Sequence, residues 1–201
     1  RTYTNVTSNL SGQNYTGAAS AELVGQFGGR CWAVCVEGNY AYIGEGHKLR
    51  ILDVSNPDSP VPLGKIALPN TVHGIVVIGG TAYVADETAG LQIVDVSNPS
   101  SPQLRGAYDT PGRAWGICVS EGLAYVADRG RGLQIIDVSN PTSPTLRGTY
   151  DTPGDSIGVV VSDGLAYVAD LGSGLQIIDV SNPTTPTLRG SYDTPGQAHL
   201  V

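Results

Sequence analysis

Residues 133–141 read Leu-Gln-Ile-Ile-Asp-Val-Ser-Asn-Pro, and this stretch decides the fold because the chain repeats it. The segment Asp-Val-Ser-Asn-Pro begins at Asp53, Asp95, Asp137 and Asp179, so it returns at a constant spacing of 42 residues. The stretches 122–154 and 164–196 differ at only four positions, 129/171, 131/173, 143/185 and 149/191. A fixed period of about 40 to 45 residues indicates a tandem array in which each repeat is one structural unit.

Each repeat contains four short segments with the composition of β-strands. In the third repeat these are residues 115–119, 123–127, 133–138 and 145–150, and residues typical of turns separate them. The Pro153-Gly154 pair that leads to the fourth repeat predicts a type II turn, since Gly accepts a positive φ at the second central position. We therefore expect four antiparallel strands in each repeat.

The third strand of each repeat is apolar on both faces. Leu133 and Ile135 point to one side of the sheet, and Ile136 and Val138 point to the other. A sheet with two buried faces needs a neighbour on each side, and radial stacking of repeats supplies both. A sandwich would leave one face polar, and a parallel β-helix would use shorter coils. The sequence therefore predicts an all-β fold, a β-propeller of four-stranded antiparallel blades.

Residues 91–99, 133–141 and 175–183 resemble the LVIVD repeat, and the resemblance extends over about residues 23–201. That family implies a β-propeller found in secreted or surface proteins of bacteria and archaea, usually without assigned chemistry. The resemblance thus implies an extracellular or cell-surface location. The first repeat departs from the pattern, because its second connection is one residue shorter and Pro69-Asn70 replaces Pro-Gly.

The two chain ends carry complementary parts of one further blade. Residues 23–27 have the pattern of a fourth strand, whereas residues 198–201 align with the start of a first strand. Residues 1–22 are rich in Ser, Thr and Asn and contain two strand-prone stretches that could supply the missing strands. Five blades would then close the ring, within one molecule or by strand exchange between copies, unless the chain is part of a longer propeller. The residues assigned to this closing contact are Tyr3, Val6, Leu23, Phe27, Ala198, His199, Leu200 and Val201.

The predicted organisation is an N-terminal segment over residues 1–22 followed by propeller repeats over 23–201. Complete blades are expected at about residues 30–69, 70–111, 112–153 and 154–195. The N-terminal segment also holds three Asn-x-Ser/Thr sequons, at Asn5, Asn9 and Asn14. They are candidate glycosylation sites or chance matches in a Ser/Thr/Asn-rich linker.

The composition argues against several classes of partner. With 11 basic and 18 acidic residues the formal net charge is −7, which disfavours a nucleic-acid surface. No apolar run approaches the roughly 20 residues of a transmembrane helix, so we expect no membrane insertion. Three cysteines form no disulfide framework, and Cys35 and Cys118 occupy a position held by Val76 and Val160 in sister repeats. We expect no metal site and no cofactor.

A residue present in every blade is most simply explained by the structure of the blade. The aspartates that begin each Asp-Val-Ser-Asn-Pro segment are expected to accept backbone hydrogen bonds in the following turn. Asp86, Asp128 and Asp170, with Glu45 in the first repeat, fit a similar account, although a ring of carboxylates could also attract cations. No catalytic combination is recognisable, so we expect no enzyme. A polysaccharide hydrolase or lyase is the lesser alternative.

Function is expected where the repeats differ. Equivalent positions near the start of each repeat hold Trp32, His73, Trp115, Ile157 and His199. Trp32, His73, Trp115 and Arg113 are the candidate ligand-binding residues, for a glycan or small molecule at the channel mouth. The same side chains would alternatively fill the channel or contact neighbouring blades. The preferred hypothesis is a non-enzymatic surface scaffold that binds copies of itself through its terminal strands, with a glycan or protein as a further partner.

Overall fold

The computed structural model describes residues 31–199, which form sixteen β-strands and one short 3₁₀ helix. The first sheet contains β1 (Cys31–Glu37), β2 (Tyr40–Glu45), β3 (Lys48–Asp53) and β4 (Val61–Ala67). The second contains β5 (Gly74–Ile78), β6 (Thr81–Ala85), β7 (Leu91–Asp95) and β8 (Gln103–Tyr108). The third contains β9 (Gly116–Ser120), β10 (Leu123–Ala127), β11 (Leu133–Asp137) and β12 (Thr145–Tyr150). The fourth contains β13 (Ser156–Ser162), β14 (Leu165–Asp170), β15 (Gly174–Asp179) and β16 (Thr187–Tyr192), with η1 (Leu171–Ser173) between β14 and β15.

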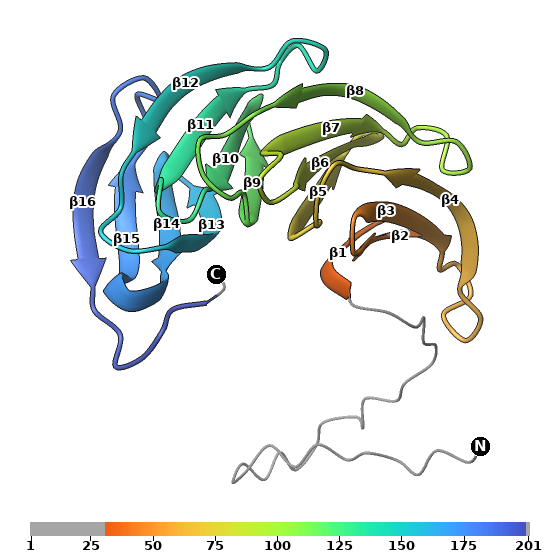
Figure 1. Ribbon diagram of the computed structural model, residues 1–201, viewed down its shortest axis with the longest axis horizontal. Helices are drawn as coiled ribbons and strands as arrows, with labels where there is room; N and C mark the ends of the chain where they lie inside the picture. The colour runs from red at the N-terminus through yellow and green to blue at the C-terminus, as the bar shows by residue number, and fades with distance from the viewer. Residues whose placement is uncertain (1–30, 200–201) are drawn as a thin grey trace, which may run out of the picture.

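The four sheets are the blades of a β-propeller, as the sequence predicts. Each sheet is antiparallel with its strands in chain order, from an inner first strand to an outer fourth strand. The blades stand side by side in an arc that is open between the first and fourth blades (Figure 1). The parts of the predicted fifth blade at residues 1–30, 200 and 201 lie outside the described residues, so a ring of five blades stays a prediction.

Local sequence and strand register explain the tight hairpins and the curvature of the outer strand in each blade. Glu121 and Gly122 both have positive φ, 51° and 77°, which is the requirement of the two-residue type I′ turn between β9 and β10. The register shifts between Ile135 and Ile136 where β11 pairs with β12, and the same irregularity recurs in the second and fourth blades. Such bulges increase the local twist, so each outer strand curves around its blade.

Three apolar cores join the four blades. The core between the first two blades is formed by residues such as Tyr42, Leu49 and Val84, all buried. Two further cores join the second blade to the third and the third to the fourth, and Leu133, Ile135 and Ile136 are completely buried in them. The prediction that these strands bury both faces is confirmed. Cys35 and Cys118 pack against these cores as small hydrophobic residues, and all three cysteines are free thiols.

Glycines allow the blades to approach each other along the inner and outer strands. A Cβ atom at Gly116 in β9 would lie 2.7 Å from the carbonyl oxygen of Ile157 in β13. On the outer strand β12, a Cβ atom at Gly148 would lie 2.1 Å from the carbonyl oxygen of Pro183 in the next blade. Both separations are too short for a real Cβ atom, so only Gly fits at these positions.

The predicted type II turn at Pro153-Gly154 is wrong, because Gly154 does not have a positive φ. Its backbone N–H donates a 2.8 Å hydrogen bond to Asp170 Oδ2 instead. The equivalent Gly112 donates in the same way to Asp128, and a Cβ atom there would lie 2.3 Å from the Asp128 carbonyl oxygen. Glycine is therefore required by close packing, and the local turn signal in the sequence is misleading.

Candidate functional site

The inner strands bring one bulky side chain from each blade to the centre of the arc. The glycines that follow His73 and Trp115 let β5, β9 and β13 pack closely. The ring centroids of Trp32 and His73 lie 5.8 Å apart, and those of His73 and Trp115 lie 4.7 Å apart in an edge-to-face arrangement. Burial lowers the pKa of His73 below its usual value, so the ring is neutral at pH 7. We call these three side chains the aromatic row.

The aromatic row forms one wall of a hollow of about 550 Å³ at the centre of the arc. The other walls are apolar and come from all four inner strands, including Ile117 in β9 and Val159 in β13. His199 also lines the hollow. Trp32 remains 56% exposed, so an aromatic face is accessible there.

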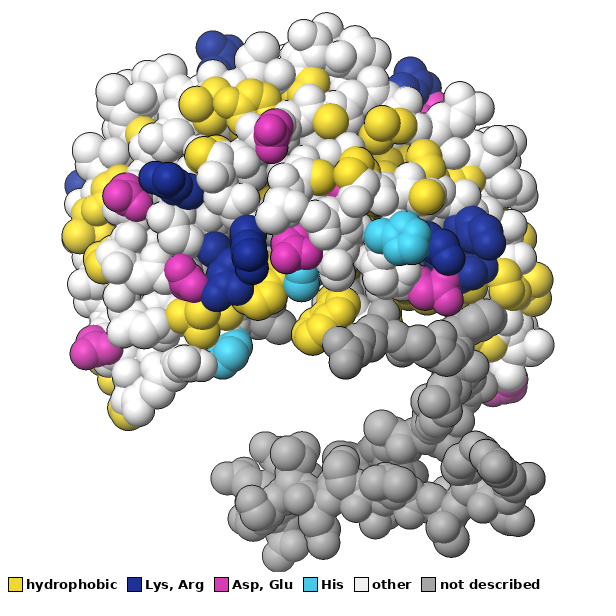
Figure 2. Space-filling model, viewed as in Figure 1, with side chains coloured by type: hydrophobic (Ala, Val, Ile, Leu, Met, Phe, Trp, Pro, Cys, Tyr) yellow, Lys and Arg dark blue, Asp and Glu magenta, His cyan; other side chains and the backbone are white. Residues whose placement is uncertain are grey.

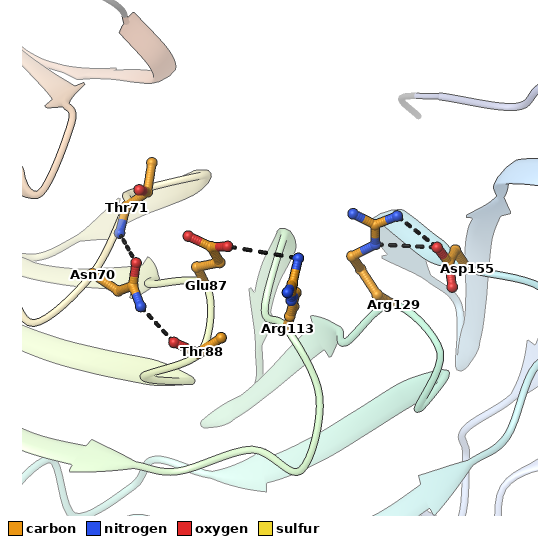
Figure 3. A network of polar contacts seen from close by, with 7 residues as sticks. All are labelled: Asn70, Thr71, Glu87, Thr88, Arg113, Arg129 and Asp155. Atoms are coloured by element: carbon orange, nitrogen blue, oxygen red, sulfur yellow. Dashed lines mark hydrogen bonds and ion pairs between the residues drawn. The ribbon is translucent and has the colours of Figure 1, made fainter.

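Arg129 connects this hollow to the rim of the arc, by which we mean the loops that carry Glu87, Arg113, Arg129 and Asp155 (Figure 3). Its guanidinium carbon lies 4.4 Å from the centroid of the Trp115 ring, a cation–π contact. Its Nη2 atom lies 2.6 Å from Asp155 Oδ2, so the guanidinium is held between an aromatic face and a carboxylate. The backbone of Arg129 has a φ of 47°, and Arg129 forms an isolated β-bridge with Ser156 of the next blade. The equivalent Glu87 has a φ of 46° and forms the same type of bridge with Ala114, so this backbone conformation belongs to the structure of the blade.

Charged side chains of both signs lie along the rim beside this contact. Glu87 in the second blade lies 3.9 Å from Arg113 in the third, measured between Oε1 and Nη1. Figure 3 shows this pair next to Arg129 and Asp155, with the Asn70 side chain further along the rim. The space-filling view shows charges of both signs along the inner edge of the arc, close to hydrophobic and histidine side chains (Figure 2). A second hollow, lined by Arg113, Arg129 and Arg131, lies on this rim.

Buried carboxylates fasten the beginning of each blade. Asp128 Oδ1 accepts a 2.7 Å hydrogen bond from the Thr110 hydroxyl while Oδ2 accepts from Gly112, and Asp170 repeats this pattern. In the second blade Leu68 replaces the threonine, which leaves Asp86 Oδ1 without a partner among the described residues. Burial raises the pKa of both Asp86 and Asp128 to about 6. The expected structural role of these aspartates is confirmed.

Two other sets of carboxylates form local contacts. The aspartates that begin the repeated Asp-Val-Ser-Asn-Pro segments each accept a hydrogen bond from the backbone N–H two residues later, as predicted. Hydrogen bonds from Ser97 and Arg105 hold the pKa of Asp95 far below its usual range. Glu45 differs from its counterparts, because it binds the Arg50 side chain at 2.8 Å. Among residues 31–199, no group of His, Cys, Asp and Glu side chains is arranged to hold a metal ion.

Three of the four candidate ligand-binding residues, Trp32, His73 and Trp115, lie together. Arg113 lies on the rim against Glu87, and the arginine that contacts the aromatic row is Arg129. The sequence contained a signal for Arg129 and Arg131, because they occupy two of the four positions at which the near-identical third and fourth repeats differ. The sequons at Asn5, Asn9 and Asn14 lie outside the described residues. The same is true of Tyr3, Val6, Leu23, Phe27, Leu200 and Val201.

The sequence profile of the LVIVD repeat matches four consecutive segments, residues 28–67, 71–110, 111–152 and 153–194. The chain belongs to the LVIVD repeat family. Its repeats coincide with the four sheets, so one LVIVD repeat corresponds to one blade of the propeller. No curated protein matches the sequence.

Two solved structures with a similar fold are computationally designed proteins. The Ika4 protein is 9% identical with a TM-score of 0.65, and the match covers 79% of this chain and 98% of Ika4. The Ika8 protein is 8% identical with a TM-score of 0.65, and the match covers 84% of this chain and 50% of Ika8. At these identities the likeness concerns the fold alone. The four LVIVD blades thus span half the length of Ika8.

The described part of this LVIVD protein has no helix of the length and apolar character needed to cross a membrane. Three features of the described residues are candidates for a functional role: the hollow with its aromatic row, the charged rim, and the two open ends of the arc. The hollow and rim can stack a ring-shaped ligand and bind a charged group. The open ends present sheet faces that can pack against another blade.

Proposed function

We propose that this LVIVD protein is a non-enzymatic extracellular or cell-surface scaffold that associates head to tail with copies of itself. The observation that carries the proposal is that the two ends of the arc expose the two halves of the interface that joins the blades internally. In a repeat array this contact is heterologous, because the two mating surfaces differ, and it can continue from one copy to the next.

The first blade exposes the face that the other blades bury against the preceding blade. Val34 and Val36 in β1 are 65% and 61% exposed. Their equivalents in the second blade, Ile75 and Val77, are each 7% exposed within the core shared with the first blade. Covering Val34 and Val36 would remove apolar area from water, which favours association.

The fourth blade exposes the opposite face. Ile177 in β15 is only half-buried and Val160 in β13 is 40% exposed, whereas Ile135, the equivalent of Ile177, is completely buried. Gly190 in β16 has no described residue near its Cβ position, although the equivalent Gly148 touches the Pro183 carbonyl oxygen of the next blade. The fourth blade therefore has the form of a blade whose successor is supplied by other residues.

One contact of Ala198 supports this proposal. The N–H of Ala198 donates a 3.0 Å hydrogen bond to the carbonyl oxygen of Leu171. The earlier blades begin in the same way, since Ala114 donates to Glu87 at 2.9 Å and Ser156 to Arg129 at 3.3 Å. Residues 198–201 would then continue as the first strand of a blade completed by the next copy, an addition of a strand across the interface.

Light scattering after size-exclusion chromatography tests the proposal, with the full chain compared with a chain that ends at Gln197. We expect the full chain to form oligomers whose mass rises with concentration, and the shortened chain to remain monomeric. A full chain that stays monomeric over the whole concentration range would contradict self-association. Oligomers of equal size in both samples would contradict the role of the terminal strand.

The location and the absence of catalysis belong to the same proposal. The family resemblance and the three N-terminal sequons support an extracellular or surface location, and fractionation of expressing cells would test it. The buried aspartates are occupied with fastening the blades, which supports a non-enzymatic role. Turnover of a polysaccharide by the purified protein, lost in a variant of these aspartates that still folds, would contradict that role.

A further inference from the structure

The hollow and the arginine-lined rim form one continuous surface. Trp115 lines the central hollow, Arg129 lines the second hollow on the rim, and the two side chains stack on each other. A single extended ligand could therefore contact the aromatic row and the rim at once. All of these residues belong to one chain, so a ligand site here does not depend on self-association.

Three arginines meet on this rim although the chain as a whole is acidic. Arg113, Arg129 and Arg131 line one hollow together with a single acidic residue, Asp155, in a protein with 11 basic residues and a net charge of −7. Arg113 and Arg131 are exposed, and among residues 31–199 no ion pair within 4.0 Å involves Arg131. Both guanidinium groups can donate two parallel hydrogen bonds to a carboxylate.

The acidic side chains of the rim can recognise hydroxyl groups. Arg129 holds the Asp155 carboxylate at 2.6 Å, whereas the Glu87 carboxylate lies 3.9 Å from Arg113, and both carboxylates have further acceptor sites. These sites can accept hydrogen bonds from ligand hydroxyls. The aromatic row provides ring faces and edges that pack against the C–H faces of a pyranose. Guanidinium, carboxylate and aromatic groups together match a ligand that carries carboxylates, hydroxyls and apolar ring faces.

We propose that this surface binds an acidic carbohydrate, a pyranose chain that carries carboxylate groups. Its carboxylates bind Arg113 and Arg131 on the rim, while a neighbouring sugar ring packs against the aromatic row in the hollow. Arg129 is a positioning residue that fixes Asp155 and covers one face of Trp115. An acidic peptide fits less well, because it lacks the ring hydroxyls that Asp155 and Glu87 would bind.

The chain itself supplies conservative variants for the test. Arg131→Ser introduces the residue found at the equivalent Ser173 of the near-identical fourth repeat, and Arg113→Gln keeps most of the side chain while removing its charge. Arg189→Gln removes an equal charge from the exposed outer strand β16, where the arginine lies 4.0 Å from Asp179. Trp32→Ala removes an exposed ring of the aromatic row.

Isothermal titration calorimetry with uronate oligosaccharides, neutral oligosaccharides of the same length and a poly-glutamate peptide tests the proposal. We expect binding of at least one uronate oligosaccharide, weakened about tenfold or more by Arg113→Gln or Arg131→Ser. Trp32→Ala should also weaken it, Arg189→Gln should leave it unchanged, and added salt should reduce it. Equal affinity for neutral sugars, equal affinity for the peptide, or no binding across galacturonate, glucuronate and mannuronate oligomers would each overturn the proposal.

Discussion

The third and fourth blades are nearly identical in sequence, but among the described residues only the third has a further blade packed on the face that carries a shared isoleucine. Replacing the equivalent isoleucine in each blade therefore measures how much that covering contributes to stability. Ile135 is completely buried in the core between the third and fourth blades, whereas Ile177 lies half-buried on the open face of the fourth. Ile→Ala in a closed core lowers the free energy of unfolding by about 2 to 5 kcal/mol, because the removed carbon atoms no longer contribute their burial and a cavity remains. We expect about 3 to 4 kcal/mol for Ile135→Ala. For Ile177→Ala we expect about 1 kcal/mol, since less area is lost and no closed cavity forms.

Urea unfolding followed by circular dichroism gives both free energies of unfolding, at a protein concentration low enough for the chain to be monomeric. The expected difference between the two variants is about 2 to 3 kcal/mol. At higher concentration the cost of Ile177→Ala should rise, because a second copy then covers this face. Equal costs at low concentration would refute the argument, since they would mean that another part of the same chain already covers Ile177.

Two further predictions concern a glycine contact between blades and a buried aspartate. Gly148→Ala should lower the free energy of unfolding by at least about 2 kcal/mol in urea titrations, because its Cβ atom would collide with Pro183. The equivalent Gly190→Ala should not destabilise the monomer. Similar losses of stability in both variants would contradict an uncovered face on the fourth blade. Asp128 has a pKa raised to about 6 by burial, so its contribution to stability is complete below about pH 3.8 and is lost as the pH rises through 6. The urea midpoint of Asp128→Asn should therefore change less between pH 5 and pH 7 than that of the natural protein, and an unchanged pH dependence would count against the burial effect.

The strands could be predicted because their signal is repeated and does not depend on context. In the third blade the sequence predicts a second strand at residues 123–127, and β10 is Leu123–Ala127. It predicts a first strand at residues 115–119, and β9 is Gly116–Ser120, shifted by one residue. Apolar residues on both faces of β11 required a blade on each side, and the three cores provide these neighbours.

The turn before each blade could not be predicted from its own residues. Pro153-Gly154 is a strong local signal for a type II turn, but Gly154 instead donates its N–H to Asp170, 16 residues later. A tertiary contact therefore determines the backbone conformation. The sequence contains both partners, although nothing in their spacing indicates that they meet.

Only part of the candidate site can be predicted from the sequence, because the rest also depends on tertiary contacts. Equivalent positions in successive repeats must lie next to each other in a propeller, so Trp32, His73 and Trp115 could be grouped from the repeat alone. Arg129 comes from a different loop, and its contact with Trp115 depends on the curvature of that loop and on Asp155. Differences between near-identical repeats identify such residues more directly than residue type does.

Mixing two variants, each with one end face blocked, tests head-to-tail association most directly. Val34→Asp places a charge on the open face of the first blade, and Val160→Asp places one on the open face of the fourth; both valines are exposed, so each variant should fold. In sedimentation velocity experiments we predict that each variant alone is monomeric and that an equal mixture forms a species of twice the mass, because one intact face of each kind remains. A mixture that stays monomeric, or single variants that associate as the natural protein does, would contradict the account.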